Sequence, residues 1–198
     1  MTELQDLLTQ LWSDAGIKKC YKQVKLIDSA GYFLHRIDEI TSEDYCPSND
    51  DILQTRLVTT GISETRFVIN DLHITMIDVG GQRIHRKKWL RCFESIQAVI
   101  FVASLAEYDQ VLEEDGQTNR THESINLFGQ LCAHKYLEQS NMILFLNKKD
   151  LFTVKLRTIP LSTCFPDYDG PNRFVSTLNF YLVKLNLKKL KSIDFQVP

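Results

Sequence analysis

Two continuous apolar runs, separated by a helical pattern, constrain the fold of this chain most strongly. "AVIFVAS" covers residues 98–104, and "MILFLN" covers residues 142–147. Runs without charges are typical of strands covered on both faces, as in parallel sheets. Residues 119–137, between them, place apolar side chains at helical spacing. The order strand, helix, strand predicts an α/β layer built on a largely parallel sheet.

The segments before residue 98 predict a helical part followed by a hairpin. Residues 2–45 show helical periodicity without a strand pattern, and a loop containing a proline is expected at residues 44–51. "ETRFVIN" and "LHITMID" are short β-branched runs joined at Asn70–Asp71, which predicts a hairpin. Residues 83–94 are expected to form another helix.

Composition excludes several classes of protein. The net charge of −2 shows no basic excess, so no nucleic-acid partner is expected. The five cysteines are odd in number and include no C-x-x-C pair, which indicates buried, reduced thiols rather than disulfides. No apolar run reaches the roughly 18 residues of a membrane span.

Polar groups gather where the expected strands end, which is where ligands bind in such sheets. Asp78 ends "ITMID", and its carboxylate could hold Mg²⁺ directly or through a water. Gly80 and Gly81 would let backbone N–H groups approach a phosphate, and Gln82 could orient a water against phosphorus. The same letters also fit a strand that ends in a glycine turn and a capped helix.

A second polar group, "LNKKD", follows the strand at 142–147. The carboxylate of Asp150 could accept hydrogen bonds from the ring N–H and the exocyclic amine of guanine, whereas adenine presents the opposite polarity. Asn147 could bond the base and the loop, and the stem of Lys148 could lie across the ring. A solvated loop between a strand and a helix is the other interpretation of these residues.

A third group, "LQTRLVTTG" at residues 53–61, precedes the hairpin. The guanidinium of Arg56 matches phosphate oxygens, and Thr59 or Thr60 offers a hydroxyl for a metal. Taken alone, this segment also fits a linker with a surface arginine.

The three groups, in this order, resemble the alpha subunits of heterotrimeric G proteins. The resemblance covers roughly residues 1–172 and is nearest to the inhibitory/other class. It is carried by "TRLVTTGISETRF", "DVGGQRIHRKKWLRCFE", "EYDQVLEEDGQTNRTHES", "ILFLNKKDLF" and "CFPDYDGPN". It implies a partial Ras-like parallel-sheet GTPase domain preceded by part of an all-helical domain. Residues 1–52 would be the end of the helical domain, residues 53–172 the GTPase core, and residues 173–198 a divergent tail, expected to be helical.

The resemblance also implies roles for individual residues. Arg56 would stabilise charge on the transferring phosphoryl group, and Gln82 would orient the attacking water. Magnesium would be held by Thr59 and, through water, by Asp78, while the N–H of Gly81 would reach the γ-phosphate. Guanine would be read by Asn147, Lys148 and Asp150. Leu53 and Gln54 would lie near the ribose, although many relatives carry arginine in place of Gln54.

By this resemblance the protein is expected to be a switch that binds GTP or GDP with Mg²⁺ and hydrolyses GTP in receptor signalling. The expected partners are the G-protein βγ dimer, a G protein-coupled receptor and a downstream effector, at the cytoplasmic face of the plasma membrane. "RIHRKKW", residues 83–89, would be the second switch segment, whose Trp89 and basic cluster face a partner.

One expected motif is missing from these residues. None of the eight glycines is followed by Lys-Ser or Lys-Thr, so the phosphate-binding pattern G-x-x-x-x-G-K-[ST] does not occur. The resemblance implies that this P-loop, the first strand and a membrane-binding helix would precede Met1. We therefore expect the 198-residue chain to bind GTP weakly and to be impaired as a GTPase. The alternative is a non-catalytic module that binds βγ or an effector through the second switch surface. A small Arf-like GTPase is disfavoured because that family lacks a counterpart of residues 1–52.

Overall fold

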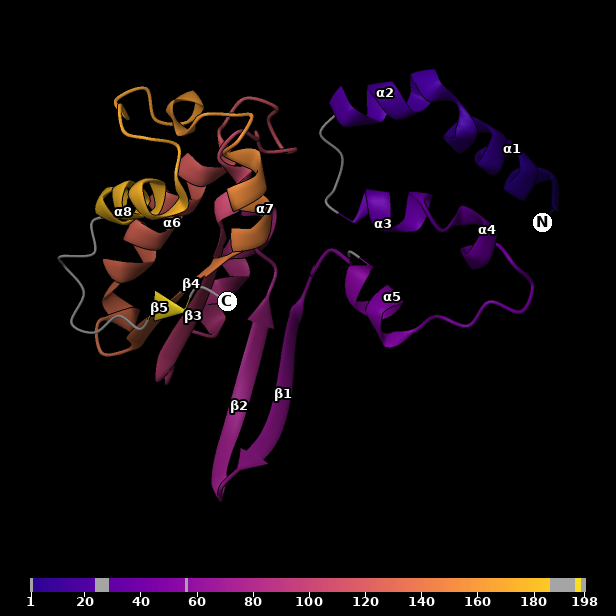
Figure 1. Cartoon of the computed structure of the whole chain (residues 1–198). Coiled ribbons are helices and arrows are strands. Elements are labelled where there is room, and N and C mark those ends of the chain that lie inside the picture. The colour runs from indigo at the N-terminus through magenta and orange to yellow at the C-terminus, as the bar shows by residue number, and fades with distance from the viewer. Residues whose placement is uncertain (1, 24–28, 56, 186–194, 197–198) are drawn as a thin grey trace. The chain divides into compact units, whose positions relative to one another are not determined.

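A computed structural model describes residues 2–23, 29–55, 57–185 and 195–196 (Figure 1). The chain divides into two compact units, Met1–Ile62 and Ser63–Pro198, which are considered separately below. The expected catalytic residue Arg56 and part of the tail, residues 186–194, lie outside the described residues.

The first unit is helical, as residues 2–45 predict. Its helices are α1 (Thr2–Ser13), α2 (Ala15–Gln23), α3 (Ala30–Leu34), α4 (Ile37–Ile40) and α5 (Asn49–Gln54). The indole of Trp12 packs edge-on against Tyr21 and His35, and the hydroxyl of Thr9 donates to Asp38 at 2.6 Å. These contacts hold α1 against the helices that follow it.

The loop expected at residues 44–51 ends early, at Ser48, because a capping box starts α5 there. The Ser48 hydroxyl accepts from the backbone N–H of Asp51, and the Asp51 carboxylate accepts from the N–H of Ser48 at 2.7 Å. Asp51 is only 3% exposed and also accepts from Tyr32 and Arg36. The hydrogen bond from Tyr32, followed by those from Ser48 and Arg36, holds the pKa of Asp51 well below its usual range.

The predicted hairpin is confirmed. Strands β1 (Ile62–Ile69) and β2 (Leu72–Val79) are joined by Asn70 and Asp71, whose φ angles are 46° and 64°. Two successive left-handed residues define the tight turn that suits antiparallel strands, and Asn and Asp tolerate that conformation better than most residues.

The predicted parallel sheet is present in the second unit as β3 (Ala98–Ser104) and β4 (Asn141–Asn147), with β5 (Phe195–Gln196) beside β4. Ala98 pairs with Asn141 and Ser104 with Asn147, so the two strands end at the same edge. The β1–β2 hairpin forms a separate sheet among the described residues, and its strands are not hydrogen-bonded to β3.

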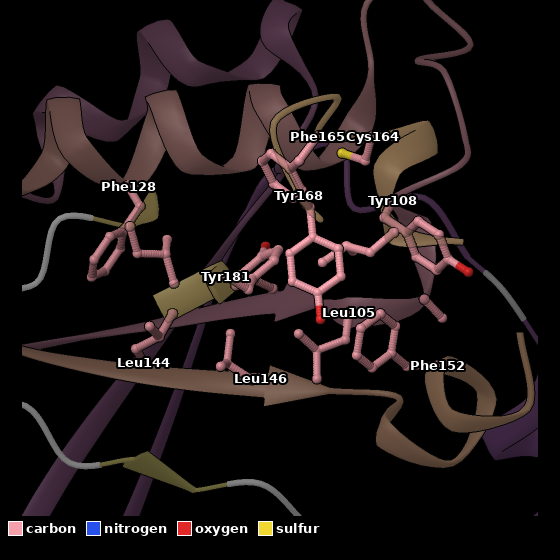
Figure 2. Packing of buried hydrophobic residues seen from close by; sticks show 14 of the residues in the cluster. Leu105, Tyr108, Phe128, Leu144, Leu146, Phe152, Cys164, Phe165, Tyr168 and Tyr181 are labelled. Atoms are coloured by element: carbon pink, nitrogen blue, oxygen red, sulfur yellow. The ribbon is translucent and has the colours of Figure 1, made fainter. Parts of the chain in front are cut away.

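One face of this sheet carries the core of the unit (Figure 2). Leu144 and Leu146 of β4 are fully buried, and Phe128 of α6 (Arg120–Cys132) packs on Phe101 of β3. Tyr181 of α8 (Phe174–Lys184) joins the same cluster.

The expectation that residues 98–104 are covered on both faces is wrong for the described residues. Ile100 and Val102 are 52% and 60% exposed. They alternate with Phe101 and Ala103, which contact the core, because successive side chains of a strand point to opposite faces. The uninterrupted apolar run therefore overstated how much of this strand the unit covers.

Shorter elements complete the second unit. They are η1 (Arg83–Arg91), η2 (Leu105–Glu107), η3 (Lys135–Leu137), α7 (Lys149–Lys155) and η4 (Leu161–Thr163). The five cysteines are free, but only Cys164 is buried, and Cys20 and Cys46 are exposed. The expectation of buried thiols therefore fails at these two positions.

Candidate functional site

The end of β4 and the start of α7 line a hollow of about 520 Å³. It is lined by Asn147, Lys148, Lys149, Asp150, Thr153 and Val154. A volume of this size suits a small organic ligand. The structure thus brings together the three residues that were expected to read guanine, and it places them around one concave surface.

Lys148 carries the backbone through this turn in a left-handed conformation, with φ 60° and ψ 39°. The left-handed conformation costs a lysine free energy, and non-glycine residues that adopt it are concentrated at ligand-binding sites and switch segments. Its N–H donates to the side-chain oxygen of Asn147 at 2.8 Å, which ties the end of β4 to the start of α7. This arrangement fixes the Asn147 side chain next to the exposed carboxylate of Asp150.

The segment from Asp78 to Gln82 begins with the last two residues of β2 and ends just before η1. Asp78 is exposed, and its carboxylate makes no hydrogen bond or ion pair with a described residue. Gln82 is half-buried and precedes η1, with no hydrogen bond from its side chain to the rest of the described structure. Both side chains therefore remain available to a ligand.

Gly81 is not explained by its protein surroundings. A Cβ added there would meet no atom within 4 Å, and the backbone is not left-handed. A ligand that approaches the N–H of Gly81 closely would account for a glycine at this position.

The oxygen donors expected for Mg²⁺, a carboxylate and a hydroxyl, are of the kind that a hard cation prefers. Carboxylate and hydroxyl oxygens suit Mg²⁺, which usually keeps several waters and takes its remaining ligands from phosphates. In the part of the chain that the structure describes, no cluster of three or more His, Cys, Asp or Glu side chains could hold a metal by itself. Asp78 could therefore serve only in the manner expected, together with a bound phosphate.

The helix expected at residues 83–94 is present as η1, a 3₁₀ helix that ends at Arg91. With three residues per turn, side chains at i, i+3 and i+6 lie in one row. Arg83, Arg86 and Trp89 form such a row, and all three make contacts inside the unit. The indole N–H of Trp89 donates to the carbonyl of Gly80 at 3.0 Å.

The two arginines of this row pair with carboxylates of α6 and of the loop before it. Arg83 Nη2 lies 2.8 Å from Glu123, and Arg86 Nη1 lies 2.6 Å from the other oxygen of the same carboxylate. Arg83 Nη1 also reaches Asp115 at 2.9 Å. The Arg86 side chain donates in addition to the carbonyl of Gly81, at 3.2 Å. Glu123 thus fixes the segment that carries Gly81 and Gln82.

These pairs set the charge states of both acids. The hydrogen bond from Arg83, and then that from Arg86, lowers the pKa of Glu123 to about 2. At Asp115 the hydroxyl of Thr118, helped by two backbone N–H groups and by Arg83, keeps the pKa well below its usual range. Both acids are therefore ionised over the whole physiological range.

Within the basic cluster, Arg83 and Arg86 pair with acids of the same unit, although the Arg83 side chain stays 40% exposed. The outward row of η1 is instead formed by Ile84, Lys87 and Leu90. Ile84 and Leu90 are 72% and 53% exposed. The sequence held a signal for the inward pairs: the acidic run Glu113–Asp115 precedes α6 and complements the basic segment.

The remaining expected residues, 53–59, belong to the first unit. Leu53 and Gln54 end α5 with exposed side chains, and Thr59 is half-buried. Their roles stay predictions.

The family model described as G-alpha, G-protein alpha subunit, matches residues 1–195 of the 198. The match extends beyond residue 172, where the quoted resemblance ends, and includes α8 and the first residue of β5.

Proposed function

The chain belongs to the G-protein alpha subunit family, and from that premise we propose that it is a guanine-nucleotide-dependent switch that hydrolyses GTP in receptor-coupled signalling. The observation that carries this proposal is the hollow at the end of β4. Its lining joins a carboxylate, an amide and a lysine stem, which is the donor and acceptor pattern that guanine requires.

In this proposal Asp150 accepts hydrogen bonds from the guanine edge, Asn147 bonds base and loop, and the aliphatic part of Lys148 covers the ring. The left-handed backbone at Lys148 supports these roles, because a solvated loop would have no reason to retain it. Leu53 and Gln54 would contact the ribose.

The phosphate end of the nucleotide would meet two segments. The N–H of Gly81 would bind the γ-phosphate, and the free amide of Gln82 would orient the attacking water. Thr59 and Asp78 would hold Mg²⁺, which when bound supplies charge neutralisation at the phosphates. Arg56 would stabilise the charge that develops during transfer. The open space at Gly81 and the unpaired Asp78 among the described residues support this assignment.

The proposed domain organisation follows the family. Residues 1–52 would be the end of the inserted helical domain, residues 53–172 the GTPase core, and residues 173–198 a divergent tail. We propose that the protein acts at the cytoplasmic face of the plasma membrane with a βγ dimer, a receptor and an effector. No described helix is both long and apolar enough to cross a bilayer.

A second candidate function is a non-catalytic module that binds βγ or an effector. The observation that favours it is the outward row of η1, formed by Ile84, Lys87 and Leu90, in which Ile84 and Leu90 are exposed. The arginines of the opposite row are meanwhile paired with Glu123. This surface is fixed within the unit by protein contacts alone, so it does not require nucleotide turnover.

Base discrimination tests the first proposal. Saturation-transfer difference NMR would compare Mg²⁺ complexes of GDP, ADP and xanthosine diphosphate with the whole chain and with Asp150→Asn. We expect the parent chain to bind GDP more tightly than the other two nucleotides. In Asp150→Asn the ratio of affinities for GDP and xanthosine diphosphate should fall at least about tenfold, because a charge-assisted hydrogen bond contributes about 1.5–3 kcal/mol. Thr153→Ser, in the same hollow, is the matched control. Equal binding of GDP and ADP by the parent would reject the base-reading role.

A further inference from the structure

Two lysines precede Asp150, the carboxylate that is proposed to read guanine, and the nearer one is in contact with an aromatic ring. Nζ of Lys149 lies 5.6 Å from the centre of the ring of Phe174, the first residue of α8. At this distance the face of an aromatic ring attracts a cation. The contact connects the hollow at β4, which Lys149 helps to line, with the divergent tail.

The ring of Phe174 is itself fixed by packing. It lies edge-on to Phe152 of α7, with ring centroids 6.2 Å apart and planes at 73°. Phe152 is fully buried in the core cluster, where it packs edge-on against Tyr108 (Figure 2). Phe174 therefore contacts α7 at two places, at an interior ring and at the ammonium of Lys149.

The backbone at Phe174 is fixed by a buried hydroxyl. Thr177, which is fully buried, places its hydroxyl 3.0 Å from the carbonyl oxygens of Arg173 and Phe174. The loop before α8 is tied as well, since the side-chain oxygen of Asn172 accepts from the N–H of Leu161 at 3.1 Å. The ring thus belongs to a well-anchored part of the unit.

The contact matters for Asp150 because it leaves this carboxylate unpaired. Asp150 is exposed and makes no hydrogen bond or ion pair with a described residue. The ring N–H and the exocyclic amine of guanine need a carboxylate in that state. The ammonium of Lys149, on its flexible four-carbon stem, could otherwise rotate toward the neighbouring carboxylate and occupy the oxygens that the base requires.

The other lysine of α7 shows that an ion pair is the alternative open to such a side chain. Lys155 pairs with Asp109 at 2.9 Å, whereas Lys149 contacts an aromatic ring. A purely structural role of the Lys149–Phe174 contact would stabilise the packing of α7 on α8, and its loss would weaken binding of every base equally. A role in keeping Asp150 unpaired predicts a loss of base selectivity.

We propose that Phe174 is a positioning residue for base recognition, which holds the Lys149 ammonium away from Asp150 so that the carboxylate can select guanine. This inference rests on the proposed function of the hollow at β4. It gives the first residue of α8 a part in specificity, although Phe174 does not line the hollow.

The experiment compares GDP with inosine diphosphate, which lacks the exocyclic amine, as Mg²⁺ complexes in saturation-transfer difference NMR of the whole chain. Phe174→Leu keeps an apolar side chain but has no aromatic face. In this variant the ratio of affinities for GDP and inosine diphosphate should fall about fivefold. Phe174→Tyr should restore the ratio of the parent. Val175→Ala, at the next and exposed position of α8, is the matched control and should not change it.

A second substitution separates positioning from packing. In the background of Lys149→Gln, which has no ammonium to release, Phe174→Leu should leave the ratio of affinities unchanged. An equal fall of the ratio in both backgrounds would overturn the positioning role. The same conclusion would follow if Phe174→Leu weakened binding of GDP and of inosine diphosphate by the same factor.

A measurement without nucleotide keeps this inference distinct from the proposed function. The ring of Phe174 should shift the ε protons of Lys149 upfield in the parent, and these protons should return to ordinary positions in Phe174→Leu. Unshifted ε protons in the parent would overturn the contact. Shifted ε protons in a parent chain that does not bind GDP would instead reject the base-reading role of the hollow, and with it the role of Phe174 in specificity.

Discussion

Glu123 has the most consequential position of any single side chain in the second unit. Its two oxygens accept from Arg83 and Arg86, and the backbone between these arginines and β2 carries Gly81 and Gln82. This carboxylate thus contributes to holding the proposed phosphate-facing segment, together with the bond from Trp89 to Gly80 and the Arg83–Asp115 pair.

Removal of this charge should loosen η1 without unfolding the unit. We expect Glu123→Gln to increase the rate of tryptic cleavage within residues 83–88 by about tenfold, because a broken charge-assisted hydrogen bond costs about 1–3 kcal/mol of local opening free energy. Limited proteolysis followed by mass spectrometry measures the rate at each site. Glu113→Gln is the matched control, since Glu113 pairs with Arg120 at the surface. Equal cleavage of both variants would show that Glu123 does not hold the segment.

The same pair predicts a pH dependence with a defined sign. The pKa of Glu123 is lowered to about 2 from an ordinary value of 4.5, so its contribution to stability is complete above about pH 4.5 and is lost as pH falls through about 2. An NMR titration of the Glu123 carboxyl carbon should give that pKa in the native chain. Arg83→Gln should raise the pKa toward the ordinary value. A native pKa near 4 would contradict the pairing.

At the scale of elements, the sequence predicts that η1 is a helix but does not predict which type of helix it is. The basic run predicts a helix, and the structure has one, but its 3₁₀ period could not be predicted because tertiary pairs select it. Arg83, Arg86 and Trp89 fall in one row only at three residues per turn. Their partners, Glu123 and Gly80, lie on other elements, and local propensity carries no information about them.

We therefore expect the affinity for a partner to depend on the outward row of η1, which consists of Ile84, Lys87 and Leu90. We expect Ile84→Glu to weaken binding of a G-protein βγ dimer more than tenfold, because a charge would replace an exposed apolar side chain at the centre of the contact. Biolayer interferometry with immobilised chain measures the affinity. Val183→Glu, equally apolar and exposed on α8, is the control and should bind as the parent does. Unchanged affinity for Ile84→Glu would remove η1 from the interface.

At the scale of the whole molecule, elements could be predicted better than their assembly. The strands at 98–104 and 142–147 and the hairpin at Asn70–Asp71 follow from local patterns, and the structure confirms each. The separation of the β1–β2 hairpin from the β3–β4–β5 sheet could not be predicted, because strand runs do not specify their partners. The exposure of Ile100 and Val102 could not be predicted either, because an apolar run does not show which face of its strand other elements cover.

The residues expected to bind nucleotide belong to both units: residues 53–59 to the first, and residues 78–82 and 147–150 to the second. The hollow at the end of β4 is the proposed site for the base, but the 198 residues contain no G-x-x-x-x-G-K-[ST] loop to hold the β- and γ-phosphates.

Phosphate contacts supply much of the affinity for nucleoside triphosphates, so base contacts alone should leave binding weak. We expect isothermal titration of the 198-residue chain with GTPγS and Mg²⁺ to give a Kd weaker than about 1 μM, that is, less than about 8.2 kcal/mol of binding free energy. Guanosine should then bind within about tenfold of GTPγS, since both would rely on the hollow at β4. Micromolar or tighter binding of GTPγS, with much weaker binding of guanosine, would mean that residues within this chain hold the phosphates without that loop.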